Sequence, residues 1–310
     1  MLSKIKKYLK NPLLIFIALK NRGFLNWLPD SLCIRIFFRI KQDLHLNLQN
    51  PKSFNEKIQW LKLHGNLQKY ANLVDKYEVR KYVSSTIGKE YLIPLLGIWD
   101  KFEDIDFNKL PEQFVLKCNH DSGSVVICTD KATFNLENAR NKLNKCLKRN
   151  FYYLHREPQY KNIKPRIICE KYMIDESGVE LKDYRIFCFN GVPKIIFVDR
   201  NILNKSTNLR NIYDIKWNYI PVSVGYPTDS NVIIEKPDNL QEMLDLAKIL
   251  SKNIPHVRID LYSIHNKIYF GELTFTHASG CQTFVPKEFG FEMGSWIELP
   301  KEEKCLLKTT

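Results

Sequence analysis

Two carboxylates stand inside apolar, strand-like runs in the last fifth of the chain. Asp260 lies in RIDLYSI and Glu272 in YFGELTF, and a short HNK turn separates the runs. Because side chains alternate along a strand, Arg258 and Asp260 share a face, and a hairpin would bring Glu272 beside Asp260. Carboxylates so placed repel unless a cation lies between them. Oxygen ligands suit Mg²⁺, whose shell substrate phosphates usually complete, and Arg258 could meet those phosphates. The alternative is a pair of edge carboxylates in a surface hairpin.

A second group of residues has the character of a phosphate site. Lys117 ends the apolar run FVLK, and the turn HDSGS at 120–124 follows before the next run, VVIC. Backbone N–H groups of a flexible turn beside a strand lysine can cover phosphates. Gly123 is the only glycine in this turn, and a lysine that merely marks a strand end is the alternative.

A third group surrounds another apolar run, RIICE. Glu170 ends it, and the backbone around Tyr172 and Met173 could bind the edge of an adenine. Asp183, which shares a strand face with Arg185, could bind a ribose. A polar strand edge with no ligand is the alternative reading.

The helices and strands that position these groups are predicted from hydrophobic periodicity and from capping and turn residues. Residues 1–70 read as helical, and Ser53 with Glu56 forms a capping box that opens a helix. A helix over 74–88 and a strand or loop over 90–100 follow, and from 112 the pattern changes to short strands. Basic and amphipathic helices interrupt the strands at 136–149 and 238–254, and Asn190-Gly191 predicts a hairpin. The layout is α+β with antiparallel sheets.

Composition narrows the class of protein. The chain has 310 residues, 44% of them apolar, and a net charge of +13, which favours anionic partners. Its eight cysteines form no CxxC pair, so we expect reduced thiols and a cytoplasmic location. The basic N-terminus carries an apolar run at 13–19 that is too short to span a bilayer. An amphipathic helix docked on the protein is favoured over peripheral contact with the inner membrane face.

The ordered segments resemble the ATP-grasp superfamily, and most closely its TupA-like branch, named for teichuronopeptide biosynthesis. The segments that carry the resemblance occur in order along nearly the whole chain: LNLQNPKSFNEKIQWLKL, VDKYEVRKYV, IGKEYLIPLLGIWD, FVLKCNHDSGSVVI, ICEKYM, LKDYRIFCFNG and RIDLYSIHNKIYFGELTFTHASG. The resemblance implies two α+β subdomains that clasp ATP with Mg²⁺. We expect a helical region over 1–70, a small subdomain with the phosphate loop over 71–169, and a large subdomain with the metal site over 170–310.

The resemblance also implies a role for each matching residue. Arg258, Lys117 and Arg185 would be catalytic. Nucleotide contacts would come from Lys76, Lys117, Ser122, Gly123, Ser124, Glu170, Lys171, Tyr172, Met173 and Asp183. Metal ligands would be Asp260, Glu272 and Thr274, where many relatives carry Asn in place of Thr274. Candidate bases are His120, His277 and Asp199, and Arg185 and Arg200 could hold an anionic substrate.

The implied activity is an ATP-dependent ligase that activates a carboxylate as an acyl phosphate for attack by an amine. The family's association with surface polysaccharide suggests a uronic acid joined to an amino acid or small amine. A kinase on the same fold is one alternative, and a glycosyltransferase is another. The DID at 104–106 lies in a polar segment that we interpret as a surface turn rather than a sugar-nucleotide metal motif. A nucleic-acid binder would suit the charge, but no recognised binding module is present.

Overall fold

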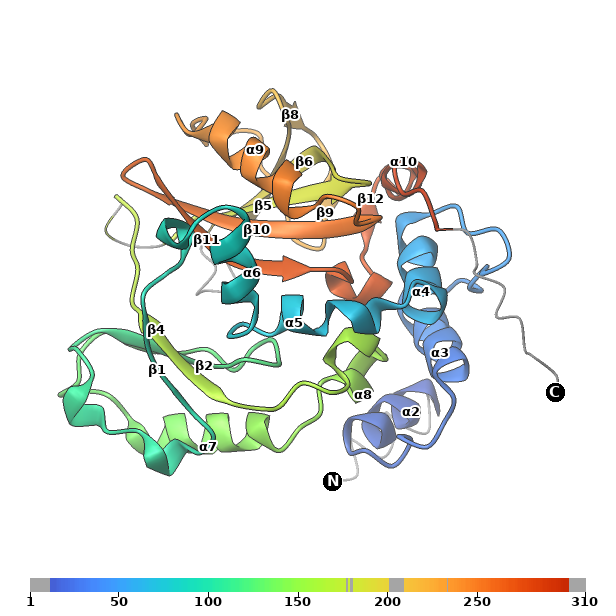
Figure 1. Cartoon of the computed structure of the whole chain (residues 1–310). Coiled ribbons are helices and arrows are strands. Elements are labelled where there is room, and N and C mark those ends of the chain that lie inside the picture. The colour runs from blue at the N-terminus through green and yellow to red at the C-terminus, as the bar shows by residue number, and fades with distance from the viewer. Residues whose placement is uncertain (1–11, 177, 179–180, 201–208, 233, 301–310) are drawn as a thin grey trace, which may run out of the picture.

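The structure is a computed structural model that describes residues 12–176, 178, 181–200, 209–232 and 234–300 (Figure 1). The basic segment 1–11 and Cys305 lie outside the described residues, as does the side chain of Arg200. Three helices open the described chain: α2 (Pro12–Asn21), α3 (Asp30–Gln42) and α4 (Phe54–His64). No helix of the described residues is both long and apolar enough to cross a membrane.

The predicted capping box is confirmed. The Ser53 hydroxyl accepts from the backbone N–H of Glu56, and the Glu56 carboxylate accepts from the backbone N–H of Ser53 at 3.0 Å. These reciprocal bonds satisfy two backbone donors that a helix start otherwise leaves unpaired, so α4 begins directly after Ser53.

The helix predicted over 74–88 is shorter than expected. The chain forms η1 (Leu67–Tyr70), α5 (Ala71–Val74) and α6 (Val79–Thr86), with turns over 75–78. The Asp75 carboxylate accepts from the N–H groups of Tyr77 and Glu78, at 2.8 and 3.2 Å. This local bond competes with helical pairing and delays the start of α6.

The smaller sheet has four antiparallel strands in the order β1 (Leu95–Trp99), β4 (Ile167–Lys171), β2 (Phe114–Cys118) and β3 (Val126–Cys128). Short η2 (Lys89–Tyr91) precedes β1, while η3 (Phe102–Asp104) and η4 (Phe107–Lys109) follow it. The DID segment therefore joins two 3₁₀ turns, since Asp104 ends η3 and Asp106 caps η4. Helix α7 (Leu136–Leu147) packs on this sheet, and α8 (Tyr152–His155) and η5 (Pro158–Tyr160) lead into β4.

The larger sheet has six antiparallel strands, in the order β11 (Lys267–Thr274), β10 (His256–Ile264), β5 (Asp183–Phe189), β6 (Val192–Arg200), β7 (Leu209–Asp214) and β8 (Tyr219–Ile220). The β5–β6 turn is the predicted hairpin, with φ of 50° at Asn190 and 79° at Gly191. Helix α9 (Leu240–Leu250) covers one face. The remaining elements are β9 (Ser223–Val224), which pairs with β12 (Phe284–Val285), η6 (His277–Gly280) and α10 (Glu288–Ser295).

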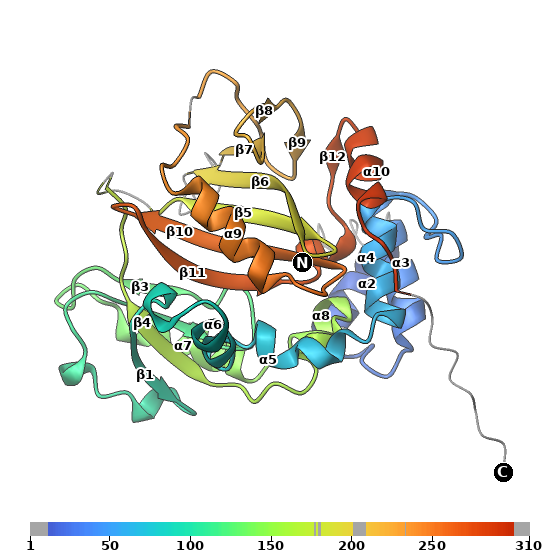
Figure 2. The ribbon, with the colours of Figure 1, turned by 45° about the horizontal axis from the view of Figure 1, so that its top comes forward.

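The layers run from α7 through the smaller sheet and the larger sheet to α9, as Figures 1 and 2 show. The thiol of Cys188 on β5 contacts the Ala247 carbonyl of α9. Because side chains alternate, Asp183 and Arg185 on β5 point away from α9. Phe54 and Ile58 of α4 share the core of the larger sheet, whereas a second core lies between the smaller sheet and α7. Helix α4 of the N-terminal region thus packs into the hydrophobic core of the larger sheet.

Candidate active site

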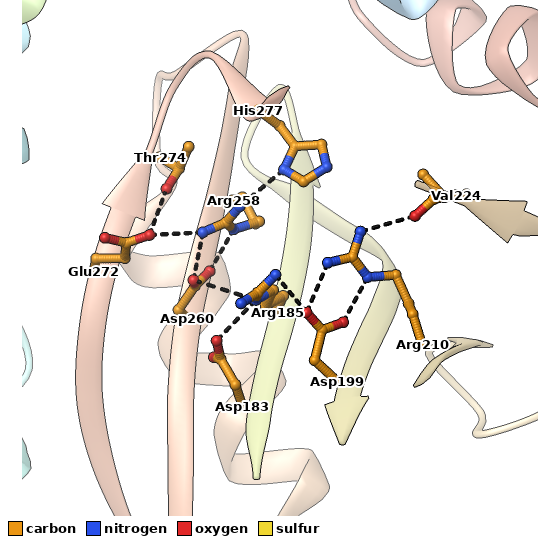
Figure 3. Close-up of polar contacts among 10 residues, drawn as sticks. All are labelled: Asp183, Arg185, Asp199, Arg210, Val224, Arg258, Asp260, Glu272, Thr274 and His277. Carbon is orange, nitrogen blue, oxygen red and sulfur yellow. Dashed lines mark hydrogen bonds and ion pairs between the residues drawn. The ribbon is translucent and has the colours of Figure 1, made fainter. Parts of the chain in front are cut away.

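The two carboxylates of the C-terminal hairpin lie opposite each other, as predicted. Asp260 on β10 pairs with Glu272 on β11, next to a bulge in the register. The Arg258 Nη2 lies 2.5 Å from Asp260 Oδ2 and 2.7 Å from Glu272 Oε1 (Figure 3). The guanidinium of Arg258 is therefore the cation that separates the two carboxylates in this structure.

Arg258 is held on a further side by a histidine. Its Nη1 lies 2.8 Å from Nδ1 of His277, in η6 directly after β11. Because a guanidinium can only donate, this Nδ1 must accept, and the ring proton sits on Nε2. Burial, and then the charge of Arg258, lower the pKa of His277 well below its usual value. His277 is thus a neutral acceptor that orients Arg258.

A row of ion pairs continues across the same face of the larger sheet (Figure 3). Arg185 on β5 contacts Asp183 at 2.8 Å and Asp199 of β6 at 2.7 Å. Arg210 on β7 then binds both oxygens of Asp199, at 2.5 and 2.7 Å. It also donates to the Val224 carbonyl of β9 at 2.9 Å. The row links β5, β6, β7 and β9 to the hairpin.

The charges in this row do not cancel. Three guanidiniums (Arg185, Arg210 and Arg258) meet four carboxylates (Asp183, Asp199, Asp260 and Glu272), so these seven side chains alone carry one surplus negative charge. Burial raises the pKa of Asp260 to about 7. Burial acts in the same direction on Glu272, but the charges of Arg258 and Lys76 outweigh it and hold the pKa of Glu272 at about 2. The Glu272 side chain is 39% exposed and stays ionised. The Asp260 side chain is only 3% exposed, so it is the carboxyl whose pKa rises.

The hairpin offers few oxygen ligands for a divalent cation. Across the described residues there is no cluster of three or more His, Cys, Asp or Glu side chains suited to a metal ion. Asp260 and Glu272 alone match Mg²⁺ that arrives with nucleotide phosphates, since that ion commonly takes one or two carboxylates. The surplus negative charge favours such a cation. The Thr274 hydroxyl donates to Glu272 Oε1 at 3.1 Å, so it orients that carboxylate, and its role as a third ligand stays a prediction.

Two predicted nucleotide residues of the smaller sheet contact each other. Lys117 Nζ on β2 lies 2.6 Å from Glu170 Oε2 on the neighbouring strand β4. Arg80 of α6 reaches the other oxygen of Glu170 at 3.6 Å. Sequence reasoning missed Arg80, although its spacing of four residues after Lys76 placed it near the same face. Both lysine and arginine charges therefore converge on the buried Glu170.

The segment after Glu170 borders a hollow. Lys171 is exposed, while Tyr172 and Met173 are half-buried. Lys171 and Tyr172 line a hollow of about 590 Å³ with residues from β1 and the end of β3. Asp183, predicted to bind ribose, has one buried carboxylate oxygen without a partner in the described structure. The contacts expected with adenine and ribose remain predictions.

The loop at 120–124 has a fixed base and a free tip. Lys76 Nζ donates to the Asp121 carbonyl at 2.5 Å, and Arg149 Nη2 reaches the Asp121 carboxylate at 3.3 Å. The Ser124 hydroxyl donates to Asp121 Oδ1 at 2.5 Å and is buried. Ser122 and Gly123 are exposed, and a Cβ added to Gly123 would meet nothing within 4 Å. The tip thus has room to accept a ligand or to move.

Below the loop, one buried amide joins three parts of the chain. Asn119 Nδ2 donates to the Asp75 carboxylate at 2.8 Å and to the Lys164 carbonyl at 3.0 Å, and its Oδ1 accepts from the Arg166 N–H at 2.7 Å. This junction fixes Lys76 beside the loop. The charge of Lys76 also helps to lower the pKa of Glu272 on the hairpin.

Each of the three candidate bases has a hydrogen-bond partner in the described structure. Burial lowers the pKa of His120, whose Nε2 lies 3.1 Å from the Arg149 carbonyl. His277 is occupied by Arg258. Although burial opposes it, pairing with Arg210 and Arg185 lowers the pKa of Asp199, which keeps this carboxylate charged. Their role as a base stays a prediction.

The N-terminal helix α4 positions η6 and hence His277. Ala278 and Ser279 have φ of 48° and 55°, a left-handed conformation that non-glycine residues rarely adopt. Gln59 Nε2 of α4 donates to the carbonyls of Ser279 and Gly280, at 2.9 and 2.8 Å. The buried Lys62 Nζ donates to the Ser279 carbonyl at 3.2 Å. Sequence reasoning did not anticipate this support, because it joins segments more than 200 residues apart.

Comparison with protein families identifies the class. The family TupA-like ATPgrasp matches residues 56–298, which include all the predicted catalytic, nucleotide and metal residues. The chain belongs to the TupA-like ATP-grasp family, and its α+β architecture with antiparallel sheets is that of an ATP-grasp protein. No match was found among curated protein sequences.

Solved structures similar to this chain include ATP-grasp proteins of several kinds. D-alanine–D-alanine ligase from Bacillus anthracis, complexed with ATP, is 17% identical over 71% of this chain and 57% of its own, with a TM-score of 0.35. An ADP complex of N5-carboxyaminoimidazole ribonucleotide synthetase is 14% identical over 71% and 50%, with a TM-score of 0.41. A RimK domain ATP-grasp protein from Sphaerobacter thermophilus is 9% identical over 74% and 69%, with a TM-score of 0.40. The chain thus spans little more than half the length of the first of these.

Proposed function

We propose that this protein is an ATP-dependent carboxylate–amine ligase that forms an amide through an acyl phosphate. The observation that carries the proposal is the Asp260–Glu272 pair, set in register on β10 and β11 with Arg258 between them. It occurs in a chain of the TupA-like ATP-grasp family, with Lys117 and Glu170 in contact on the facing sheet.

In the proposed reaction a substrate carboxylate oxygen attacks the γ-phosphorus of ATP, and ADP leaves. The amine then attacks the carbonyl carbon of the acyl phosphate, loses a proton, and expels inorganic phosphate. Asp260 and Glu272 would hold Mg²⁺ that accompanies the nucleotide and neutralises phosphate charge. Lys76 and Lys117 would bind phosphates, and the tip at Ser122 and Gly123 would cover them and exclude water.

In this proposal Arg258 first separates the two carboxylates and then stabilises the transferring phosphoryl group. In the structure its guanidinium bonds to both carboxylates, so a divalent cation held by Asp260 and Glu272 would shift it. The guanidinium would then be free to face the transferring phosphoryl group, where positive charge stabilises the transition state. His277 would keep one edge of the guanidinium in place during the shift.

For the substrates, we propose a uronic acid carboxylate and an amino acid or small amine, used in capsule or other surface polysaccharide. The family resemblance suggests this pairing, and a net charge of +13 suits an acidic glycan or sugar nucleotide. A cytoplasmic site of action is proposed because the seven cysteines of the described residues are all free thiols.

The experiment is a product analysis with purified protein, ATP, Mg²⁺ and a panel of uronic acids and amines. We expect ADP, inorganic phosphate and an amide in equal amounts, and no phosphate release when the carboxylate is omitted. Glu272→Gln should abolish turnover, whereas Glu292→Gln, an exposed residue of α10, should not. A phosphorylated product without phosphate release would establish a kinase and overturn the ligase proposal. Turnover of a sugar nucleotide without ATP would establish a glycosyltransferase.

A further inference from the structure

The turn between α2 and α3 displays two aromatic side chains to solvent. Phe24 is 63% exposed and Trp27 is 78% exposed. The indole N–H of Trp27 donates to the Phe24 carbonyl at 3.0 Å, which keeps the two residues together. Further exposed apolar side chains flank the turn on the two helices: Ile15, Leu19 and Leu32.

The protein interior holds this turn in place. Arg156, 3% exposed, donates to the Leu25 carbonyl at 2.7 Å and to the Asn26 carbonyl at 3.2 Å. The buried ammonium of Lys20, at the end of α2, also donates to the Leu154 carbonyl. Because these bonds draw the middle of the turn inward, the rings on either side project outward. Their exposure is therefore a fixed feature of the fold.

The charge around the turn is one-sided. In sequence, residues 1–29 contain six Lys or Arg and no Asp or Glu, and four of the six lie in segment 1–11, outside the described residues. At the turn itself Arg22 is exposed, whereas Asp30, which follows it, is paired with Tyr152 and Arg156. Anionic lipid headgroups attract basic segments of this kind, and aromatic rings settle at the boundary between headgroups and acyl chains. Like charges in this basic segment oppose its pairing with a second copy of the chain.

We propose that the α2–α3 turn is a peripheral docking surface for an anionic membrane, with Phe24 and Trp27 inserted at the interface. The binding is independent of the proposed ligase activity, because neither residue lies in the predicted site.

The test uses the full chain and sedimentation with vesicles of phosphatidylcholine, with or without phosphatidylglycerol. We expect binding to the anionic vesicles only, and weaker binding at high salt. The double variant Phe24→Ala/Trp27→Ala should lower the partition coefficient by about tenfold or more, since each ring contributes apolar burial. Phe291→Ala, which removes a ring 53% exposed on α10, is the matched control and should bind as the wild type does.

Fluorescence gives a second readout. Of the five tryptophans, all within the described part of the chain, only Trp27 is exposed. Acrylamide should quench Trp27 in free protein, and anionic vesicles should protect it. Absence of vesicle binding, or equal binding by the double variant, would overturn the proposal. Two further results would overturn it. One is that Trp27 of the free protein is protected from acrylamide and loses this protection when residues 1–11 are deleted. The other is a dimer in sedimentation analysis that Trp27→Ala dissociates.

Discussion

Substituting Asp260 by Asn tests the charge balance of the site. In the folded protein burial raises the pKa of Asp260 from 3.8 to about 7. The folded state therefore binds this proton more tightly than the unfolded chain does. The stabilisation from the proton is full below the unfolded pKa, near 4, and is lost as the pH rises through about 7.

The size of the effect follows from the shift. Between pH 5 and pH 8 the free energy of unfolding should lose about 2–3 kcal/mol from this carboxyl. Buried His256 and His277, whose pKa values are lowered, act in the opposite direction over part of this range. The quantity to measure is therefore the difference between wild type and Asp260→Asn, in which the histidine contributions cancel.

The assay is urea unfolding of both proteins at pH 5, 6, 7 and 8 and constant ionic strength. The amide also disturbs the bidentate contact with Arg258, but that cost is an offset that does not depend on pH. We expect wild type to lose stability relative to Asp260→Asn as the pH rises. A difference constant within about 0.5 kcal/mol across the range would refute the reasoning. A carbon-13 titration of the Asp260 carboxyl gives an independent check.

Three further substitutions probe other parts of the network. Glu272→Gln should lower ATP turnover by at least about 100-fold with little change in melting temperature, since Glu272 is partly exposed; retained turnover would contradict the proposed metal site. Lys117→Ala should weaken ADP affinity measured by calorimetry, because it removes a predicted phosphate contact, whereas exposed Lys145→Ala should not; equal affinities would remove Lys117 from the nucleotide site. Asp199→Ala leaves buried Arg210 without its bidentate partner and should destabilise the fold by about 3–5 kcal/mol in urea unfolding; a loss below about 1 kcal/mol would mean that water or Val224 satisfies Arg210.

The sequence predicted those features that depend on neighbours along the chain. The capping box of α4, the Asn190-Gly191 hairpin and the pairing of Asp260 with Glu272 are all local, and each is confirmed. The helix over 74–88 was wrong in its first turn for an equally local reason. There Asp75 accepts from the backbone of Tyr77 and Glu78, and periodicity does not reveal such a bond.

Contacts between distant segments could not be predicted in this way. The cation between the hairpin carboxylates is Arg258 itself, because rotamer choice and burial decide where a long side chain ends. Arg80 meets Glu170 only once tertiary packing brings α6 and β4 together. Composition and spacing along the chain do not reveal that Arg80 and Glu170 lie close together.

What the sequence determined by itself is the chemistry available: paired carboxylates, strand lysines and a turn able to cover phosphates, in the order of an ATP-grasp protein. What only the tertiary structure decided is how the charges balance. Four carboxylates and three guanidiniums lie on one buried face, and the surplus charge falls on Asp260. The physical reason is that strand alternation fixes which face a side chain occupies, whereas the pKa depends on burial and on charges that other strands bring near.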